Sequence, residues 1–188
     1  LRNSRDEKLL ALQTIERLLD DGQLGQNPGL YIVLESLASE GTTRIVRQGG
    51  STVVNDYPEV RRGAAELLGR VGGQRAQTSL TQMLGTEPEP MVLAEAVYAL
   101  GEIGLNPDNT VVNHIVMMLR EQNARVTPDN NLAFATLLAI EALNEAQGGI
   151  PDPNLIDAIL GVAAGNYVTS VRLKAFEVIE TLRNTRQQ

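Results

Sequence analysis

Apolar side chains recur with a helical period in four stretches of this chain. Each largely apolar set begins at one residue and continues 4, 8 and 11 residues later, and these offsets lie within about 80° of one another on a helix turning about 100° per residue. The four sets are Val60, Ala64, Leu68 and Val71; Val92, Ala96, Leu100 and Ile103; Leu132, Thr136, Ile140 and Leu143; and Val171, Ala175, Ile179 and Leu182. The pattern predicts four amphipathic helices, each with one buried face.

The first two stretches are near copies of each other. Residues 58–72 read PEVRRGAAELLGRVG and residues 90–104 read PMVLAEAVYALGEIG, and the two lie 32 residues apart. The third and fourth stretches begin 40 and 39 residues further on and lack the closing glycines. A period of this length predicts an array of helical repeats, in which each unit buries its apolar face against its neighbours.

A further helix is expected before each of these four. Apolar residues spaced by four lie on one helix face, and such pairs are Val33 and Leu37, Leu80 and Leu84, Ile115 and Leu119, and Ile156 and Leu160. An amphipathic helix over about residues 5–19 opens the chain. We therefore predict an all-α fold of about nine helices in a single domain spanning residues 1–188. Its parts are a capping helix at 1–22 and helix-pair repeats at 27–72, 73–104, 106–144 and 150–185.

The first helix pair is interrupted by an insertion at residues 41–57, which is long for a connection in a compact domain. It contains β-prone residues on both sides of Gly49-Gly50. This pattern is typical of a β-hairpin at about residues 42–54, and an extended loop lying over the first repeat is the alternative. Because loops on a rigid scaffold often carry function, the insertion is a candidate binding element.

Composition supports a helical core and excludes several classes of partner. Hydrophobic residues make up 43% of the chain and aromatic residues 3%, with no Trp, whereas sheets favour aromatic and β-branched residues. The formal net charge of −7 argues against nucleic acid or an anionic membrane as the main partner. No apolar run approaches the ~20 residues of a membrane span. Without Cys, the chain has no disulfide and no thiolate metal site.

The repeat motif resembles a known family. The string that runs through Asp56-Tyr57-Pro58, Val60-Arg61, Ala64-Ala65, Leu68-Gly69 and Val71-Gly72 is similar to the HEAT repeat, and more narrowly to the short bacterial version named after phycobilisome lyases. The second copy departs from the family pattern, with Leu93 where Arg is usual. The resemblance covers about residues 27–183. It implies a right-handed α-superhelix whose second helices line a concave face.

The roles of four glycines in the motif follow from backbone geometry and do not depend on the family resemblance. Gly69 and Gly101 permit the close approach of neighbouring helices, because they carry no Cβ. Gly72 and Gly104 stand where the C-terminus of a helix favours a left-handed residue.

Residues suited to catalysis or metal binding are scarce. His114 is the single histidine, and a lone His without a spaced acidic cluster is expected to be an ordinary surface or half-buried residue. The paired acids Glu87/Glu89 and Asp20/Asp21 lie at predicted turns, where we expect solvated carboxylates. We therefore predict no catalytic residue, no cofactor site and no metal site. A subunit of a bilin-lyase-like enzyme stays open as an alternative, because such enzymes share this repeat.

Side chains opposite the buried stripe are the candidates for binding. They lie 2, 6 and 9 residues after the start of each set, and the larger apolar ones are Tyr98, Phe134, Leu138 and Leu173. If exposed, they form an apolar strip flanked by charge, which is typical of a protein-binding surface. The alternative is that superhelical curvature buries them between neighbouring second helices.

Charge is distributed unevenly along the chain. Residues 41–75 hold six Arg and three acids, a net of +3, whereas residues 87–157 hold eleven acids and two Arg, a net of −9. We expect Arg44, Arg47, Arg62 and Arg70 to contribute to partner binding. The polarity would orient a partner or drive head-to-tail self-association into a weak homo-oligomer; solvated helix faces explain the acidic half equally well. Arg61 has a second interpretation, as a donor to helix carbonyls within its repeat.

The sequence thus favours a non-enzymatic scaffold that binds another protein through the concave strip, the insertion or both. A purely structural spacer within a larger protein is a further alternative. The first residue is Leu1, as expected after removal of an export leader. We therefore favour a periplasmic or exported protein over a cytoplasmic one.

Overall fold

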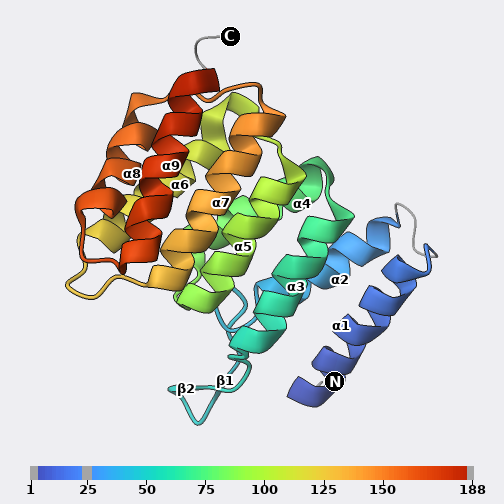
Figure 1. Cartoon of the computed structure of the whole chain (residues 1–188). Helices are drawn as coiled ribbons and strands as arrows, with labels where there is room; N and C mark the ends of the chain where they lie inside the picture. Colours follow the sequence, from blue (N-terminus) through green and yellow to red (C-terminus); the bar gives the residue numbers. More distant parts are fainter. Residues whose placement is uncertain (1–3, 23–26, 186–188) are drawn as a thin grey trace.

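The computed structural model describes residues 4–22 and 27–185, and in these ranges it contains nine α-helices (Figure 1). The helices are α1 (Arg5–Asp20), α2 (Pro28–Ala38), α3 (Pro58–Val71), α4 (Gly73–Thr86), α5 (Pro90–Ile103), α6 (Thr110–Asn123), α7 (Asn130–Ala146), α8 (Pro153–Ala164) and α9 (Thr169–Thr185). A 3-10 turn, η1 (Pro107–Asn109), precedes α6, and two short strands, β1 (Arg47–Gln48) and β2 (Thr52–Val53), lie between α2 and α3.

The helices form two layers. The second helices of the four pairs, α3, α5, α7 and α9, lie side by side in one layer, which α1 extends beyond α3 (Figure 1). The first helices, α2, α4, α6 and α8, form the other layer. The predicted all-α solenoid of about nine helices is therefore confirmed.

Helix ends follow the sequence signals. The Ser4 hydroxyl accepts a hydrogen bond from the Glu7 backbone N–H, and the Glu7 carboxylate accepts one from the Ser4 backbone N–H, which together cap α1. Pro occupies the first turn of α2, α3, α5 and α8, where its missing N–H costs nothing. Gly72 and Gly104 end α3 and α5 with φ of 68° and 70°, a region that side chains rarely adopt.

The buried stripes of the second helices follow the predicted periodicity, although Val71 and Ile103, which end the first two sets, are only partly buried. Every residue of the third and fourth sets is buried, including Thr136, whose hydroxyl donates to the Leu132 carbonyl at 2.7 Å. Leu, Ile, Val and Ala from all four pairs form one continuous core. Each repeat therefore depends on its neighbours for burial of its apolar surface.

The predicted stripe of α8 is wrong by one position, and that of α2 is wrong at Val33, although Leu37 is buried as predicted. Val33 in α2 and Leu160 in α8 are exposed, whereas Leu34 and Ile159 are fully buried. Both helices carry consecutive apolar residues, so spacing by four fits two adjacent faces about 100° apart. Packing against neighbouring helices selects the other face.

Small residues bring the second helices close together. A Cβ added at Gly69 of α3 would lie 2.7 Å from the Ala99 Cβ of α5, and one at Gly101 would lie 2.7 Å from the Ala139 Cα of α7. The predicted close approach is confirmed. Gly69 and Gly101 lie nine residues after the start of their sets, a position that we had expected on the outward surface. That expectation is wrong for these two residues, because both face the next helix.

The insertion contains the expected hairpin in a short form. β1 and β2 are antiparallel, with Arg47 opposite Val53, and the turn between them places Gly49 and Gly50 at φ of 63° and 90°. Asn55 closes the base of the hairpin, since its side chain accepts from the Val46 N–H at 2.8 Å and donates to the Arg44 carbonyl at 2.6 Å.

Candidate functional site

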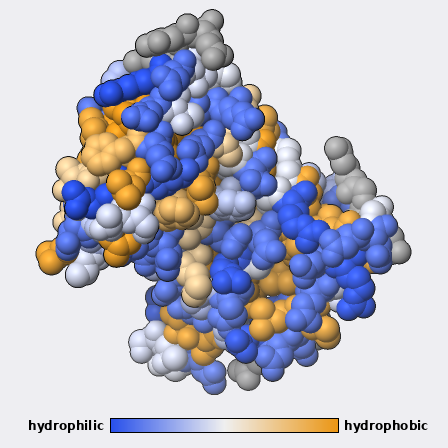
Figure 2. Space-filling view, viewed as in Figure 1, coloured by the Kyte–Doolittle hydropathy of each residue, from blue (hydrophilic) through white to orange (hydrophobic). Residues whose placement is uncertain are grey.

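The outward surface of α3, α5, α7 and α9, here called the second-helix face, carries side chains two and six residues after the start of each buried stripe. These residues are Arg62, Glu66, Ala94, Tyr98, Phe134, Leu138, Leu173 and Glu177. Figure 2 shows hydrophobic patches over the C-terminal helices at the upper left, with hydrophilic side chains between them. The face is therefore mixed, apolar in places and bordered by charge.

Its apolar part lies on α5, α7 and α9. Tyr98 is 42% exposed, Phe134 is 37% exposed, and Leu138 is half-buried. Phe134 and Leu138 line a hollow of about 390 Å³ between the first halves of α7 and α9, together with Val168. Curvature of the array therefore does not bury Tyr98 and Phe134 between the second helices.

A charged group adjoins this apolar part at α3 and α5. Burial raises the pKa of Glu95, the nearby Glu66 carboxylate raises it further, and Arg62 opposes both. Arg62 itself is exposed, with Nη1 3.7 Å from the Met91 sulfur. A half-buried carboxylate with a like charge nearby favours an added cation at this end of the face.

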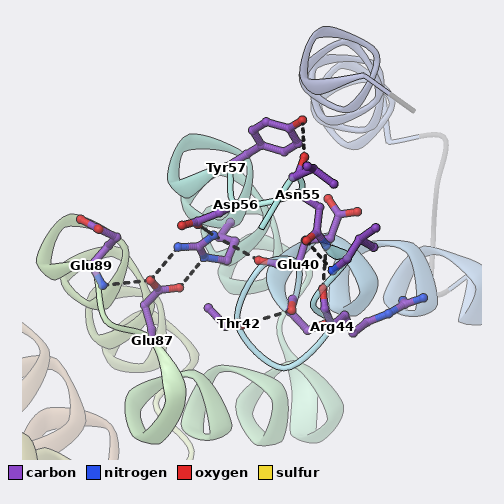
Figure 3. Close-up of polar contacts among 12 residues, drawn as sticks. Glu40, Thr42, Arg44, Asn55, Asp56, Tyr57, Glu87 and Glu89 are labelled. Carbon is purple, nitrogen blue, oxygen red and sulfur yellow. Dashed lines mark hydrogen bonds and ion pairs between the residues drawn. The ribbon is translucent and has the colours of Figure 1, made fainter. Parts of the chain in front are cut away.

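Next to the insertion, Arg61 forms a buried polar network with groups of Glu40, Asp56 and Glu87, which are labelled in Figure 3. Its guanidinium is fully buried and contacts both carboxylate oxygens of Glu87 at 2.7 and 3.0 Å. Nη1 donates to Asp56 at 2.6 Å and to the Glu40 carbonyl at 3.1 Å. Arg61 therefore joins both ends of the insertion, at Glu40 and Asp56, to the connection between α4 and α5 at Glu87.

This network bears on two expectations from the sequence, one for Glu87 and one for Arg61. Glu87 is not a solvated turn carboxylate: it is buried, and its charge is paired with the buried guanidinium of Arg61. Arg61 is engaged within the chain, but not with helix carbonyls as the second interpretation had it: its acceptors are the Glu40 carbonyl, just beyond the end of α2, and the carboxylates of Asp56 and Glu87. One feature of the sequence points to this network. Arg61 occupies a repeat position at which Leu93 and Ala133 are buried apolar residues, so a buried, paired Arg is expected there.

Other arginines of the basic segment are also engaged within the chain. Arg70 pairs with Glu16 at 3.5 Å and with Asp20, which attaches α1 to α3. Arg75 forms a bidentate pair with Glu35 at 2.7 Å, and its hydrogen bonds lower the pKa of that carboxyl.

Arg44 and Arg47 belong to the insertion. Arg44 donates to the Ser36 hydroxyl, and Arg47 donates to the Ser51 carbonyl at 2.9 Å across the hairpin turn. Within residues 4–22 and 27–185, neither of them nor Arg62 forms an ion pair with a carboxylate.

Two hollows flank the insertion, and the sequence did not reveal them. One, of about 850 Å³, lies between α2, α4 and the start of the insertion and includes Arg44 and Arg75. The other, of about 840 Å³, lies between α1, α2 and the hairpin; Ile32, Val46 and Arg47 are among its lining residues. Each combines α2 and part of the insertion with a helix that lies further along the chain or earlier in it, so no single local pattern marks it.

The structure adds little catalytic chemistry. His114 is half-buried, as expected, with Nδ1 2.9 Å from the Thr110 carbonyl. In the part of the chain that the structure describes, no three His, Asp or Glu side chains are arranged to hold a metal ion. None of the helices described has both the length and the apolar character needed to cross a bilayer.

Comparison with protein families identifies one match. The family model for HEAT repeats matches residues 52–129, which include α3 to α6. The match covers the two near-copies and the first helix of the third pair, and the remaining helix pairs have the same arrangement. The architecture is thus an all-α HEAT-type solenoid. Comparisons with curated proteins and with solved structures give no significant match.

Proposed function

We propose that this chain is a non-enzymatic scaffold that binds another protein on its second-helix face, with the insertion as a second contact. HEAT repeats generally act as protein-interaction scaffolds, and the family is typically non-catalytic. The residues that we assign to binding are Tyr98, Phe134 and Leu138 on the face, Arg62 at its charged border, and Arg44 and Arg47 on the insertion. Arg70 also belongs to the predicted set, although its ion pairs attach α1.

The observation that carries the proposal is the hollow between α7 and α9. Phe134 and Leu138 line it, and Tyr98 stands exposed on the neighbouring α5. Aromatic side chains set in a rigid surface are frequent anchors of protein interfaces, because they bury a large area at a small entropic cost. A buried, repeat-wide core beneath them supplies that rigidity.

The chemistry of the face indicates the kind of partner. An apolar side chain of the partner enters the hollow beside Phe134, and a basic side chain is favoured next to Glu66 and Glu95. Acidic groups are favoured near the insertion, where Arg44 and Arg47 have no carboxylate partner in the described residues. Complementary charges at the border set orientation and association rate more than affinity.

The test is a quantitative pull-down from the source cells with wild type and the triple variant Arg62→Ala, Tyr98→Ala, Phe134→Ala. A matched control changes Asn113, Met117 and Asp157 to Ala, three exposed residues of the first-helix layer that lie on α6 and α8, away from the insertion. We expect the face variant to lose at least one partner and the control to lose none, both with the helical circular-dichroism spectrum of wild type. Recovery of the same proteins by all three chains would exclude this face and leave a structural spacer.

A further inference from the structure

The α8–α9 repeat exposes a second-helix position that the three earlier repeats bury. In the second helices, the fifth residue after the start of the buried stripe is Ala65, Val97 or Leu137, and each is fully buried where the next second helix packs. The equivalent residue of α9 is Phe176, which is 51% exposed. A large aromatic residue therefore stands where the array would continue.

The first helices show the same change. Leu80, Ile115 and Ile159 are fully buried at equivalent places in α4, α6 and α8. The residues that follow them, Thr81, Val116 and Leu160, are therefore equivalent as well. Thr81 and Val116 are buried, whereas Leu160 of α8 is 40% exposed. Among the described residues, both helices of the α8–α9 pair therefore carry a large apolar side chain on the side turned away from α6 and α7. We call this surface the end face and define it as Ile156, Leu160, Arg172, Phe176 and Glu180.

The geometry of α9 agrees with this assignment. Lys174 faces α7, because its Nζ lies 2.7 Å from a carboxylate oxygen of Glu141. Phe176 follows two residues later, about 160° round the helix at about 100° per residue. Phe176 thus points away from α7.

The opposite end of the array is covered differently. There α1 packs on α3 with Leu12 buried, and its outer side is mostly polar, with Leu10 as the large apolar exception. Terminal repeats of solenoids need a polar outer face to stay soluble on their own. Among residues 4–22 and 27–185, no element covers Leu160 and Phe176 in this way.

Charge around Phe176 is self-complementary. Arg172 and Glu180 lie four residues before and after it, on the same side of α9. When two copies of α9 cross antiparallel at Phe176, Arg172 of each copy meets Glu180 of the other, twice by symmetry. The Arg172 side chain is held on this side of α9, since its Nε donates to the Ala163 carbonyl at 2.9 Å, and within residues 4–22 and 27–185 it forms no ion pair.

We propose that the end face binds a second copy of this chain in a two-fold, tail-to-tail dimer. Phe176 packs on Phe176 at the centre and Leu160 packs on Leu160 between the α8 helices, with the Arg172–Glu180 pairs at the border. The dimer joins two solenoids end to end and leaves both second-helix faces free. It is thus independent of the binding proposed for that face.

The size of the end face predicts a weak association. α9 is about 25 Å long at 1.5 Å per residue, and two helices side by side are about 20 Å wide, so each copy contributes about 500 Å². The total of about 1,000 Å² is at the low end for specific interfaces. We therefore expect a dimer that dissociates in the micromolar range.

Sedimentation equilibrium of the 188-residue chain, at concentrations up to about 1 mM, measures this association. We expect wild type to dimerise and Phe176→Asp to weaken dimerisation at least ten-fold, with an unchanged helical spectrum. Leu173→Asp is the matched control, because Leu173 is equally exposed on α9 but belongs to the second-helix face. We expect it to dimerise like wild type.

A charge exchange tests the antiparallel register. Arg172→Glu and Glu180→Arg should each be monomeric, because each brings like charges together at both borders. Mixed in equal amounts, the two variants should form a heterodimer, in which both borders again join opposite charges. Their thermal midpoints, measured separately, distinguish loss of association from loss of folding.

A monomeric wild type at the highest concentration would overturn the proposal and leave the end face to a helix of another protein. A dimer that Phe176→Asp does not weaken would overturn it as well. Failure of the two charge variants to associate on mixing would exclude the antiparallel register.

Discussion

At the scale of single residues, Arg61 decides how the insertion is attached. Its buried guanidinium joins the Glu40 carbonyl, Asp56 and Glu87, which lie on three separate segments. A buried charge is tolerated only when its partners satisfy it, because desolvation is otherwise too costly. The position of the hairpin therefore depends on this one side chain.

Removal of Glu87 should be costly. We expect Glu87→Ala to lower the free energy of unfolding by about 3 kcal/mol, since it leaves a buried guanidinium with only Asp56 as a charged partner. The measurement is urea denaturation followed by circular dichroism. Glu89→Ala is the control, because the Glu89 side chain is exposed two residues away, and its effect should stay within about 0.5 kcal/mol. Equal effects of the two variants would show that Arg61 does not need Glu87.

Ionisation of Glu95, next to the second-helix face, makes the stability of the folded state depend on pH. Its folded pKa is raised, so ionisation of Glu95 at neutral pH destabilises the folded state, and this cost disappears as pH falls below the ordinary value of 4.5. Glu95→Gln should therefore raise the thermal midpoint at pH 7, and the gain should shrink towards pH 4.5. Thermal unfolding across this range checks it. A gain that is constant with pH would contradict the assignment.

At the scale of elements, small residues set the spacing of the second helices. Gly101 packs against Ala139 with no room for a methyl group, because its Cβ would meet the Ala139 Cα at 2.7 Å. When two helix backbones are in such close contact, an added methyl group forces them to shift and strains the structure. The second-helix layer is therefore tightly coupled from α3 to α7.

Two glycine substitutions should have opposite effects. Gly101→Ala should cost about 1–3 kcal/mol through overpacking. Gly85→Ala in α4 meets no atom within 4 Å and should stabilise the helix by up to about 1 kcal/mol. Chemical denaturation of both variants compares them under the same conditions. Stabilisation by Gly101→Ala would contradict the close approach of α5 and α7.

At the scale of the whole molecule, the sequence predicted the architecture because its signals are local. Apolar spacing within each second helix, the prolines at helix starts and glycines such as Gly104 depend on residues a few positions apart. The partnership of Arg61 with Glu87 spans 26 residues and was missed. The hollows beside the insertion were also missed, because each needs a helix brought in from another part of the chain. The buried face of α8 was missed as well, since its adjacent apolar residues fit two registers.

The candidate surface was predicted in part. The repeat register identified Tyr98 and Phe134 as outward residues, but exposure depends on how closely α5, α7 and α9 pack, and only the structure shows that. Arg70 appeared free in the sequence because its partners Glu16 and Asp20 lie on α1, about fifty residues earlier.

The most direct measurement of the central claim is site-specific photo-cross-linking of the scaffold in the source cells. A benzophenone amino acid replaces Phe134 on the second-helix face in one sample and Met117, exposed on α6, in the other. We predict a discrete cross-linked partner from position 134 that is absent from position 117 and is lost when Tyr98 and Arg62 are changed to Ala. Identical cross-linking from both positions, or none from position 134, would contradict the account.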